Sequence, residues 1–222
     1  MAPRTDTRER VLDAALLAFG TQGFDATSLD QLAVELGVRK QTILYYFPSK
    51  AELLDAVVDR SSQDLAGELV RAIDGAGPGF ARIEALVRAV FALAMSQPEL
   101  LGLIREASRL GPHTASRLFV NLAPLVDQAT GFLEAEMRAG RFRKSDPKLL
   151  LVSVYSTVLG AATEVEVLRA IGIEPSLRTA VLRRRQIIEF LRYALVPEPA
   201  AAKPRASQRN RIDPTKRTRP RP

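Results

Sequence analysis

The side chains of this chain best suited to chemistry are the polar ones between positions 39 and 50. Gln41 and Tyr45 are four residues apart, so they share one face if the segment is helical. Ile43 and Phe47 have the same spacing and would face a core on the other side. An amide and a phenol on an exposed face can form hydrogen bonds with base edges in the DNA major groove. The pattern therefore favours a short helix that is buried on one side and reads DNA with the other.

A second short helix is predicted just before this one. Ser28 and Gln31 have the spacing of a capping box, so a helix can begin here. Gly37 stands where a left-handed residue ends a helix at the lowest cost. Pro48 disfavours continuation of the second helix. The apolar residues between these signals recur at helical spacing on one face: Leu29, Leu32, Ala33 and Leu36.

Two stretches of the sequence resemble the tetracycline-repressor (TetR) family of transcriptional regulators. Residues 37–50, GVRKQTILYYFPSK, are similar to the family's recognition half. Residues 5–23, with Ala14-Ala15 and the following FGTQGF, are similar to its first helix and the exit from that helix. The resemblance is specific over roughly residues 5–55 and rests on length and helical layout beyond them. One position departs from the family, which often has an aromatic residue where this chain has Leu44.

This resemblance implies that the head binds double-stranded DNA. Gln41 and Tyr45 are the candidates for reading base edges. Thr27, Tyr46 and Lys50 are, by resemblance, the candidates for phosphate contacts. The complete candidate DNA-binding set is Thr27, Ser28, Arg39, Lys40, Gln41, Thr42, Tyr45, Tyr46 and Lys50.

The net charge of +7 comes mostly from the end of the chain. From Val196 onward, eight basic residues stand against two acidic ones, so this stretch carries +6 and the rest only +1. Residues 197–222 are rich in Pro, Ala and Arg, and Ile212 is their only large apolar residue. We expect them to be disordered, because they cannot offset their ordering entropy. Such a tail either adds non-specific phosphate contacts or only solubilises the chain.

Helical periodicity dominates the remainder and no convincing strand is found, so the sequence predicts an all-α fold. Helices are expected at about 52–74, 80–96, 98–110, 114–139 with a kink or break at Pro124, 147–171 and 176–195. The resemblance implies an N-terminal three-helix helix-turn-helix head followed by a C-terminal helical domain for ligand binding and dimerisation. The expected division is therefore 1–48 for the head, 49–196 for the regulatory and dimerisation domain, and 197–222 for the disordered basic tail.

The two last predicted helices have the pattern of an interface between subunits. Residues 149–162 are apolar almost all round, and such a helix needs burial on every side. The final helix carries its own apolar stripe. Two such helices meeting a symmetry mate would form a four-helix interface of a homodimer, although an ordinary core within one chain is the alternative. The candidate interface residues are Val158, Ala162, Val181, Ile188 and Leu191.

Aromatic and polar residues of the middle helices suggest a site for a small-molecule effector. A cavity lined in this way suits a largely apolar ligand with one or two hydrogen-bonding groups. The alternative is that the aromatic residues only fill the core. The candidate ligand-binding residues are Phe91, Met95, Phe119, Asn121, Gln128, Phe132 and Tyr155.

The sequence carries no catalytic motif that we can identify. It has no Cys, a single His (His113), no Gly-rich phosphate loop, and neither a G-x-S-x-G nor an H-E-x-x-H motif. We therefore expect no enzymatic activity, no cofactor and no metal site. No apolar run approaches the roughly 18–20 residues that cross a bilayer, and no apolar signal region is present at the N-terminus. A cytoplasmic protein without a membrane partner is expected.

Two functions stay open at this point. The first is a ligand-responsive transcriptional regulator, expected to be a repressor, that binds a palindromic operator as a homodimer and is released by a small effector. The second is an architectural or non-specific DNA-binding protein without a small-molecule effector. The helical body at 49–196 favours the first function, because it is larger than dimerisation alone requires.

Overall fold

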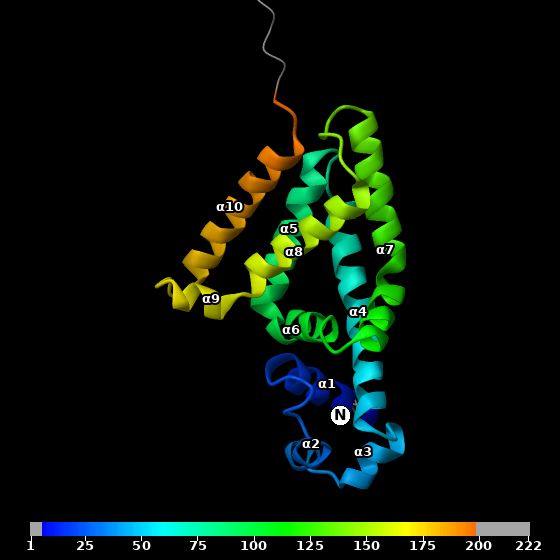
Figure 1. Ribbon diagram of the computed structural model, residues 1–222. Helices are drawn as coiled ribbons and strands as arrows, with labels where there is room; N and C mark the ends of the chain where they lie inside the picture. Colours follow the sequence, from blue (N-terminus) through cyan, green and yellow to red (C-terminus); the bar gives the residue numbers. More distant parts are fainter. Residues whose placement is uncertain (1–5, 199–222) are drawn as a thin grey trace, which may run out of the picture.

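Residues 6–198 are the part of the chain that this computed structural model describes, and ten α-helices occupy most of them (Figure 1). The helices are α1 (Thr7–Thr21), α2 (Leu29–Leu36), α3 (Lys40–Tyr46), α4 (Lys50–Asp74), α5 (Phe80–Ser96), α6 (Pro98–Ala107), α7 (Pro112–Arg138), α8 (Pro147–Thr163), α9 (Val165–Ala170) and α10 (Leu177–Leu195). No strand occurs in this part, which confirms the predicted all-α fold. The predicted disordered tail lies, from residue 199 onward, outside the described residues.

Helices α1 to α3 form the head at the lower end of Figure 1. The predicted capping box is present: Ser28 Oγ accepts from the backbone N–H of Gln31, and the Gln31 side chain accepts from that of Ser28. Gly37 ends α2 with a φ of 65°, in the left-handed region that glycine enters without a Cβ penalty. Ile43 and Phe47 are buried, as predicted. Local sequence signals thus produce the helix-turn-helix.

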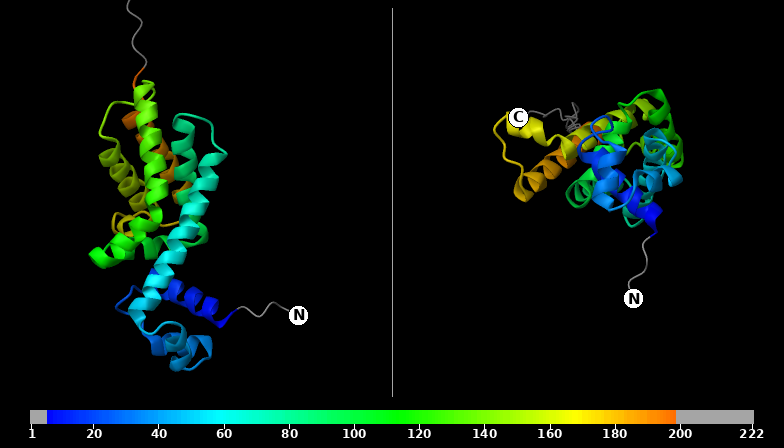
Figure 2. Two further views of the ribbon diagram at one scale, coloured as in Figure 1. Left: turned by 90° about the vertical axis from the view of Figure 1, so that its right-hand side faces the viewer. Right: turned by 90° about the horizontal axis from the view of Figure 1, so that it is seen from below.

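The long helix α4 joins the head to the body. Ser49 caps its N-terminus by accepting from the backbone N–H of Glu52. From this point beside α3, the helix runs upward along the body, where it packs against α5 and α7 (Figures 1 and 2). Its start in the head and its end in the body make α4 a continuous connection between the two.

A second connection between head and body is the close contact of α1 with α6. Gly20 of α1 and Gly102 of α6 let the two backbones touch: a Cβ on Gly20 would collide with the carbonyl of Glu99, and one on Gly102 with the carbonyl of Gly20. Glu106 of α6 also accepts from the backbone N–H of Phe24, at 3.3 Å. The head is therefore fixed to α6 by backbone packing and by a polar contact with the loop after α1.

The buried apolar residues form two clusters. The first cluster lies at the head end and takes most of its residues from α1, α2, α3, α4 and α6, with Leu93 of α5 and Leu118 of α7. It includes Val11, Phe19, Leu32, Ile43, Leu53, Leu101 and Leu103. The second cluster lies between α5, α7, α8 and α10, and it includes Ile83, Val87, Phe91, Leu133, Val154, Val158 and Leu191. The first cluster is continuous across the predicted boundary at residue 48.

Two expectations about the helices differ from the structure. Helix α7 continues through Pro124, so the predicted break does not occur. Pro124 is exposed, and so is Val120, four residues earlier, so water can satisfy the carbonyl that loses its partner. The helix predicted at 147–171 is two helices, α8 and α9, interrupted at Glu164. There the Glu164 side chain turns to Arg105 of α6, at 2.8 Å.

Within the described residues, no single helix is long and apolar enough to cross a membrane. Helices α5 and α6 reach that length and composition only when taken together, and the chain bends by 106° between them. The bend places α6 across the end of the body, where it meets α1 (Figure 1).

Candidate nucleic-acid interface

The exposed face of α3 carries the residues predicted to read bases. Ile43 is completely buried against the head core, and this anchors the helix by one side. Gln41 is exposed on the other side, and 81% of the Tyr45 surface is accessible. An unpaired amide and phenol at the end of the molecule can reach base edges in a groove wide enough to admit a helix.

Tyr45 and Tyr46 form an aromatic pair at the end of α3. Their ring centroids are 5.1 Å apart with the planes nearly perpendicular, an arrangement favoured by the ring quadrupoles. Tyr46 is half-buried, and its side chain packs against the head core. Leu44 is half-buried and packs there too. Thr42 is also half-buried. The pair restrains the Tyr45 ring, so less side-chain entropy is lost when Tyr45 contacts a partner.

The basic candidates differ in how firmly they are held. Arg39, the residue before α3, is exposed and forms no ion pair within the described residues. Lys40 pairs with Asp30 at 2.8 Å. Lys50, the first residue of α4, lies 4.2 Å from the centroid of the Phe24 ring and donates to the carbonyl of Asp25 at 3.4 Å. Lys50 thus adds charge at a helix N-terminus, where the backbone N–H groups already favour an anion.

The environment of Thr27 does not suit its predicted phosphate contact. Only 4% of its surface is accessible, and its hydroxyl donates to the carbonyl of Gly23 at 2.9 Å. Its side chain therefore holds the loop between α1 and α2. Ser28 is half-buried, and its hydroxyl already accepts the capping hydrogen bond from Gln31, which leaves only its proton for a phosphate.

The predicted ligand-binding residues do not converge on one cavity. Phe91 and Met95 line a small cleft between α5 and α10. Phe132 packs edge-on against Phe142, with ring centroids 5.9 Å apart. The guanidinium of Arg82 lies 5.5 Å from the centroid of the Phe132 ring. Phe119, Gln128 and Tyr155 are exposed. The seven residues therefore do not share one cavity in this structure, and only Phe91 and Met95 line a cleft.

Asn121 belongs to a polar cluster that ties α7 to α4. Its amide donates to Asp59 at 2.8 Å, and Arg117 donates to the same carboxylate. The hydrogen bond that Arg117 donates to Asp59 raises the pKa of Arg117. His113, the one histidine, lies 3.3 Å from Asp55. The cluster fixes α7 alongside the helix that carries the head.

The predicted interface residues divide into buried and accessible ones. Val158 and Leu191 are only 3% and 2% accessible and belong to the second cluster, so they are core residues of the chain itself and the prediction for these two is corrected. Val181 and Ile188 line an open groove between α5 and α10, and Ala162 lines the small cleft. Apolar residues that α8 and α10 do expose include Leu149, Val152, Leu182 and Phe190.

Nothing in the described part of the chain provides a metal-binding group of three or more His, Asp or Glu residues. Buried Glu136 has a structural role: Arg141 donates to Glu136 Oε1 at 2.9 Å and lowers the pKa of this carboxyl. Sequence reasoning missed one functional candidate, Arg183, which lines the small cleft. Its neighbour Ala161 is 22 positions away, so no local pattern could have revealed the contact.

The head and body together define a class of protein. A three-helix head with an anchored, outward-facing α3, joined to an all-helical body, is the architecture of a helix-turn-helix transcriptional regulator. Residues 11–57 match the family of bacterial regulatory proteins called the tetR family. The head is therefore similar to the DNA-binding part of this family, and the comparisons support a TetR-family transcriptional regulator.

Individual proteins agree with this assignment. The HTH-type transcriptional regulator RutR of Escherichia coli K12 is 28% identical over 151 residues, which are 68% of this chain and 71% of RutR. The HTH-type transcriptional repressor DrrR1 of Streptomyces coeruleorubidus is 33% identical over 108 residues, 49% of this chain and 39% of DrrR1. The crystal structure of the transcriptional regulator FadR from Bacillus subtilis in complex with stearoyl-CoA has the same fold, with a TM-score of 0.68 at 16% identity over 82% of this chain and 96% of that one.

Proposed function

We propose that this transcriptional regulator is a cytoplasmic repressor that binds a palindromic operator as a homodimer and releases it when a small effector binds. The observation that carries the proposal is α3, which buries Ile43 and directs Gln41 and Tyr45 outward from the end of the molecule. Among the relatives, DrrR1 is described as a repressor, and FadR from Bacillus subtilis was solved with stearoyl-CoA. DrrR1 supports the repressor role, and FadR supports a response to a ligand.

The DNA-binding step needs two heads. Each α3 occupies one major groove, so a dimer reads two half-sites about one or two helical turns apart. Gln41 and Tyr45 contact base edges, whereas Arg39, Tyr46 and Lys50 hold the phosphates on either side. The N-terminus of α4 adds backbone N–H donors next to Lys50.

The dimer is proposed to form through the apolar surface that α8 and α10 leave exposed. Leu149 and Val152 are one turn apart on α8, and both are mostly accessible in the single chain. Leu182 and Phe190 are two turns apart on α10, and each is a little more than half accessible. A monomer seldom exposes so many large apolar side chains on neighbouring helices without a partner. A two-fold pairing of these helices gives a four-helix interface.

The proposal is tested by selecting binding sites from random DNA with the wild type and three variants. Gln41→Ala is expected to relax specificity at one position of each half-site by about 1–3 kcal/mol, because one base-edge contact is lost. Lys50→Ala should weaken binding to all sequences alike and lower the salt dependence. Gln128→Ala, an equal truncation at an exposed position of α7, is the control and should change nothing.

If the wild type selects no preferred sequence at matched salt, the proposal is overturned and an architectural DNA-binding protein is favoured. An unchanged sequence preference in Gln41→Ala would remove the base-reading role of that residue.

A further inference from the structure

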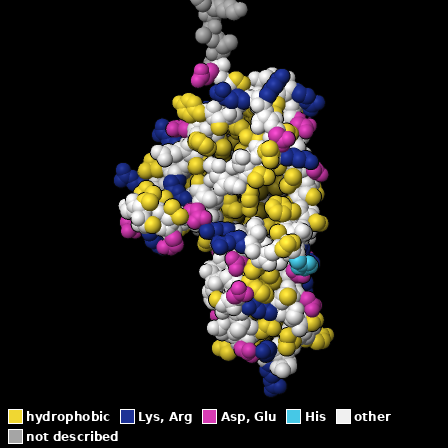
Figure 3. Space-filling model, in the orientation of Figure 1, with side chains coloured by type: hydrophobic (Ala, Val, Ile, Leu, Met, Phe, Trp, Pro, Cys, Tyr) yellow, Lys and Arg dark blue, Asp and Glu magenta, His cyan; other side chains and the backbone are white. Residues whose placement is uncertain are grey.

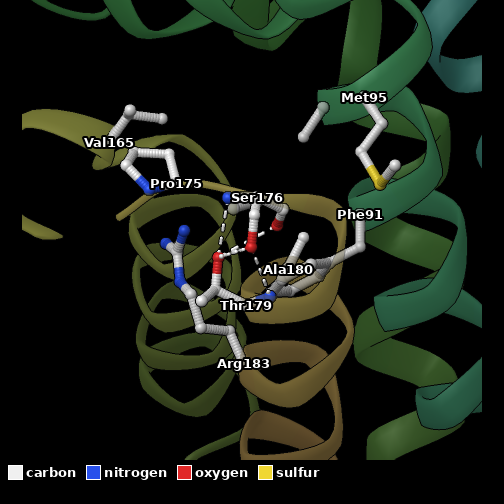
Figure 4. Close-up of a pocket in the computed structure, with 10 residues that line it drawn as sticks. Phe91, Met95, Val165, Pro175, Ser176, Thr179, Ala180 and Arg183 are labelled. Carbon is white, nitrogen blue, oxygen red and sulfur yellow. Dashed lines mark hydrogen bonds between the residues drawn. The ribbon is translucent and has the colours of Figure 1, made fainter. Parts of the chain in front are cut away.

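The small cleft between α5 and α10 is lined by apolar side chains, two hydroxyl groups and one charge. Its volume is about 110 Å³. Phe91 and Met95 of α5 line one side, and Ala180 lines the opposite side from α10 (Figure 4). Val165, the first residue of α9, closes a third side. Arg183 is the single charged residue among those that line the cleft in the described part of the chain.

Arg183 lacks an anionic partner. Its guanidinium is half-buried and donates to the carbonyl of Ala161 at the end of α8. No acidic side chain of the described residues lies within ion-pair distance of it, although most arginines of the body have such a partner. Burial lowers the pKa of Arg183, because removal from water penalises the charged form. A guanidinium has five N–H donors, so donors remain free beside the cleft.

The other polar groups of the cleft are already engaged. Ser176 and Thr179 exchange the two hydrogen bonds of the capping box that begins α10. The hydroxyl of Thr179 also lies within hydrogen-bonding distance of the carbonyl of Glu174, at 3.1 Å. Figure 4 places both hydroxyls next to the Arg183 side chain. The charge of Arg183 is therefore the main polar feature that the cleft offers to a ligand.

We propose that this cleft binds a small organic monocarboxylate, with its carboxylate on Arg183 and its apolar part against Phe91 and Met95. Arginine recognises a carboxylate through two parallel hydrogen bonds, which suit a planar anion. Apolar walls disfavour an inorganic anion, which would leave most of its oxygens without donors. A cavity of about 150 Å³ accommodates benzene. This cleft is smaller but opens to solvent, so it can take most of a phenyl ring and leave the far edge of the ring outside.

The position of the cleft connects it to the head, and this step rests on the proposed function. Glu164, next to Val165 in the cleft wall, pairs with Arg105 of α6 at 2.8 Å. Helix α6 in turn holds α1 through the Gly20–Gly102 contact. A carboxylate that shifts the α8–α9 junction therefore acts on the helix that fixes the head.

The site is tested by isothermal titration of the full-length protein with benzoate and with benzamide, its neutral isostere. We expect benzoate to bind with at least tenfold higher affinity than benzamide, because only the anion can pair with Arg183. Arg183→Gln should reduce benzoate affinity at least tenfold while still offering a donor to Ala161. The control is Arg178→Gln, which removes the same charge from an exposed position of α10.

Absence of benzoate binding to the folded wild type at millimolar concentration overturns the site, as does equal binding of benzoate and benzamide. Full affinity in Arg183→Gln also overturns it. If this variant does not fold, Arg183→Lys decides, and retention of full affinity by the lysine would contradict bidentate recognition. Operator affinity with and without benzoate is a separate readout. Binding that depends on Arg183 but leaves operator affinity unchanged supports the site and refutes the effector role.

Discussion

Replacement of Gly102 by alanine tests whether backbone contact with α1 fixes the head to the body. The new Cβ would meet the carbonyl of Gly20, a backbone group that cannot swing aside. The two helices must then separate and lose contacts in the first cluster. Overpacking of a core costs about 1–3 kcal/mol and sometimes more, and contact with backbone favours the upper end. Alanine is more favourable than glycine in a helix by about 1 kcal/mol, so the net decrease in the free energy of unfolding is about 2 kcal/mol.

Gly131→Ala is the matched control for this substitution. Gly131 lies inside α7, and a Cβ there would have no atom within 4 Å. The same gain in propensity should therefore stabilise this variant by about 1 kcal/mol. For a chain of this size, 1 kcal/mol corresponds to a change of roughly 2–4 °C in melting temperature.

The assay is thermal unfolding followed by circular dichroism. Gly102→Ala should melt about 4–8 °C below the wild type, and Gly131→Ala about 2–4 °C above it. The two substitutions are chemically identical, so only the surroundings of the added methyl group can give opposite signs. A Gly102→Ala variant that melts at or above the wild-type temperature would refute the backbone contact between α1 and α6.

Two further predictions concern the acid stability of the body and the proposed dimer. The hydrogen bond from Arg141 lowers the pKa of buried Glu136, so its carboxylate stabilises the fold above the unfolded pKa of roughly 4.3, and this contribution disappears as the pH falls through the lower native value. Glu136→Gln should lower the free energy of unfolding by about 1–3 kcal/mol at pH 7, as measured in urea. The decrease of this free energy at acidic pH should become shallower, and an unchanged decrease would contradict this reasoning. Val152→Arg should leave the melting of the monomer unchanged but weaken dimerisation by about 3 kcal/mol in sedimentation, whereas Val120→Arg on α7 should not. A fully dimeric Val152→Arg would exclude α8 from the interface.

The parts of the fold predictable from sequence are those set by residues close together in the chain. Ser28, Gln31 and Gly37 determine the ends of α2 by contacts within one turn, so they were identified without the structure. The same is true of Pro98 and Pro147, which stand at the first position of helices expected to begin there. Glu164 separates α8 from α9, and no local signal predicts this break. The partner of Glu164 is Arg105, which comes from a distant part of the chain.

Periodicity also predicts that a side chain is buried without saying by what. Val158 and Leu191 lie on apolar stripes, but their own chain covers them, so they differ from Val152, which no part of the described chain covers. Thr27 was assigned to a phosphate by resemblance, whereas the fold turns its hydroxyl toward the carbonyl of Gly23. Partners of this kind depend on tertiary packing, which one sequence does not contain.

The continuity of the first cluster has a consequence for how the protein opens and unfolds. Residues of the head share this cluster with Leu53 and Val57 of α4 and with Leu101 and Leu103 of α6, so the head cannot melt without exposing the body side of the same core. The unit of cooperative opening therefore includes α1 to α4 and α6, although the proposed DNA-binding residues lie only on or beside α3 and at the start of α4. In native-state hydrogen exchange, the amides of α1 should lose their protection in the same opening event as those of α6. A fragment cut after α3 would keep the reading surface but not the core that holds it.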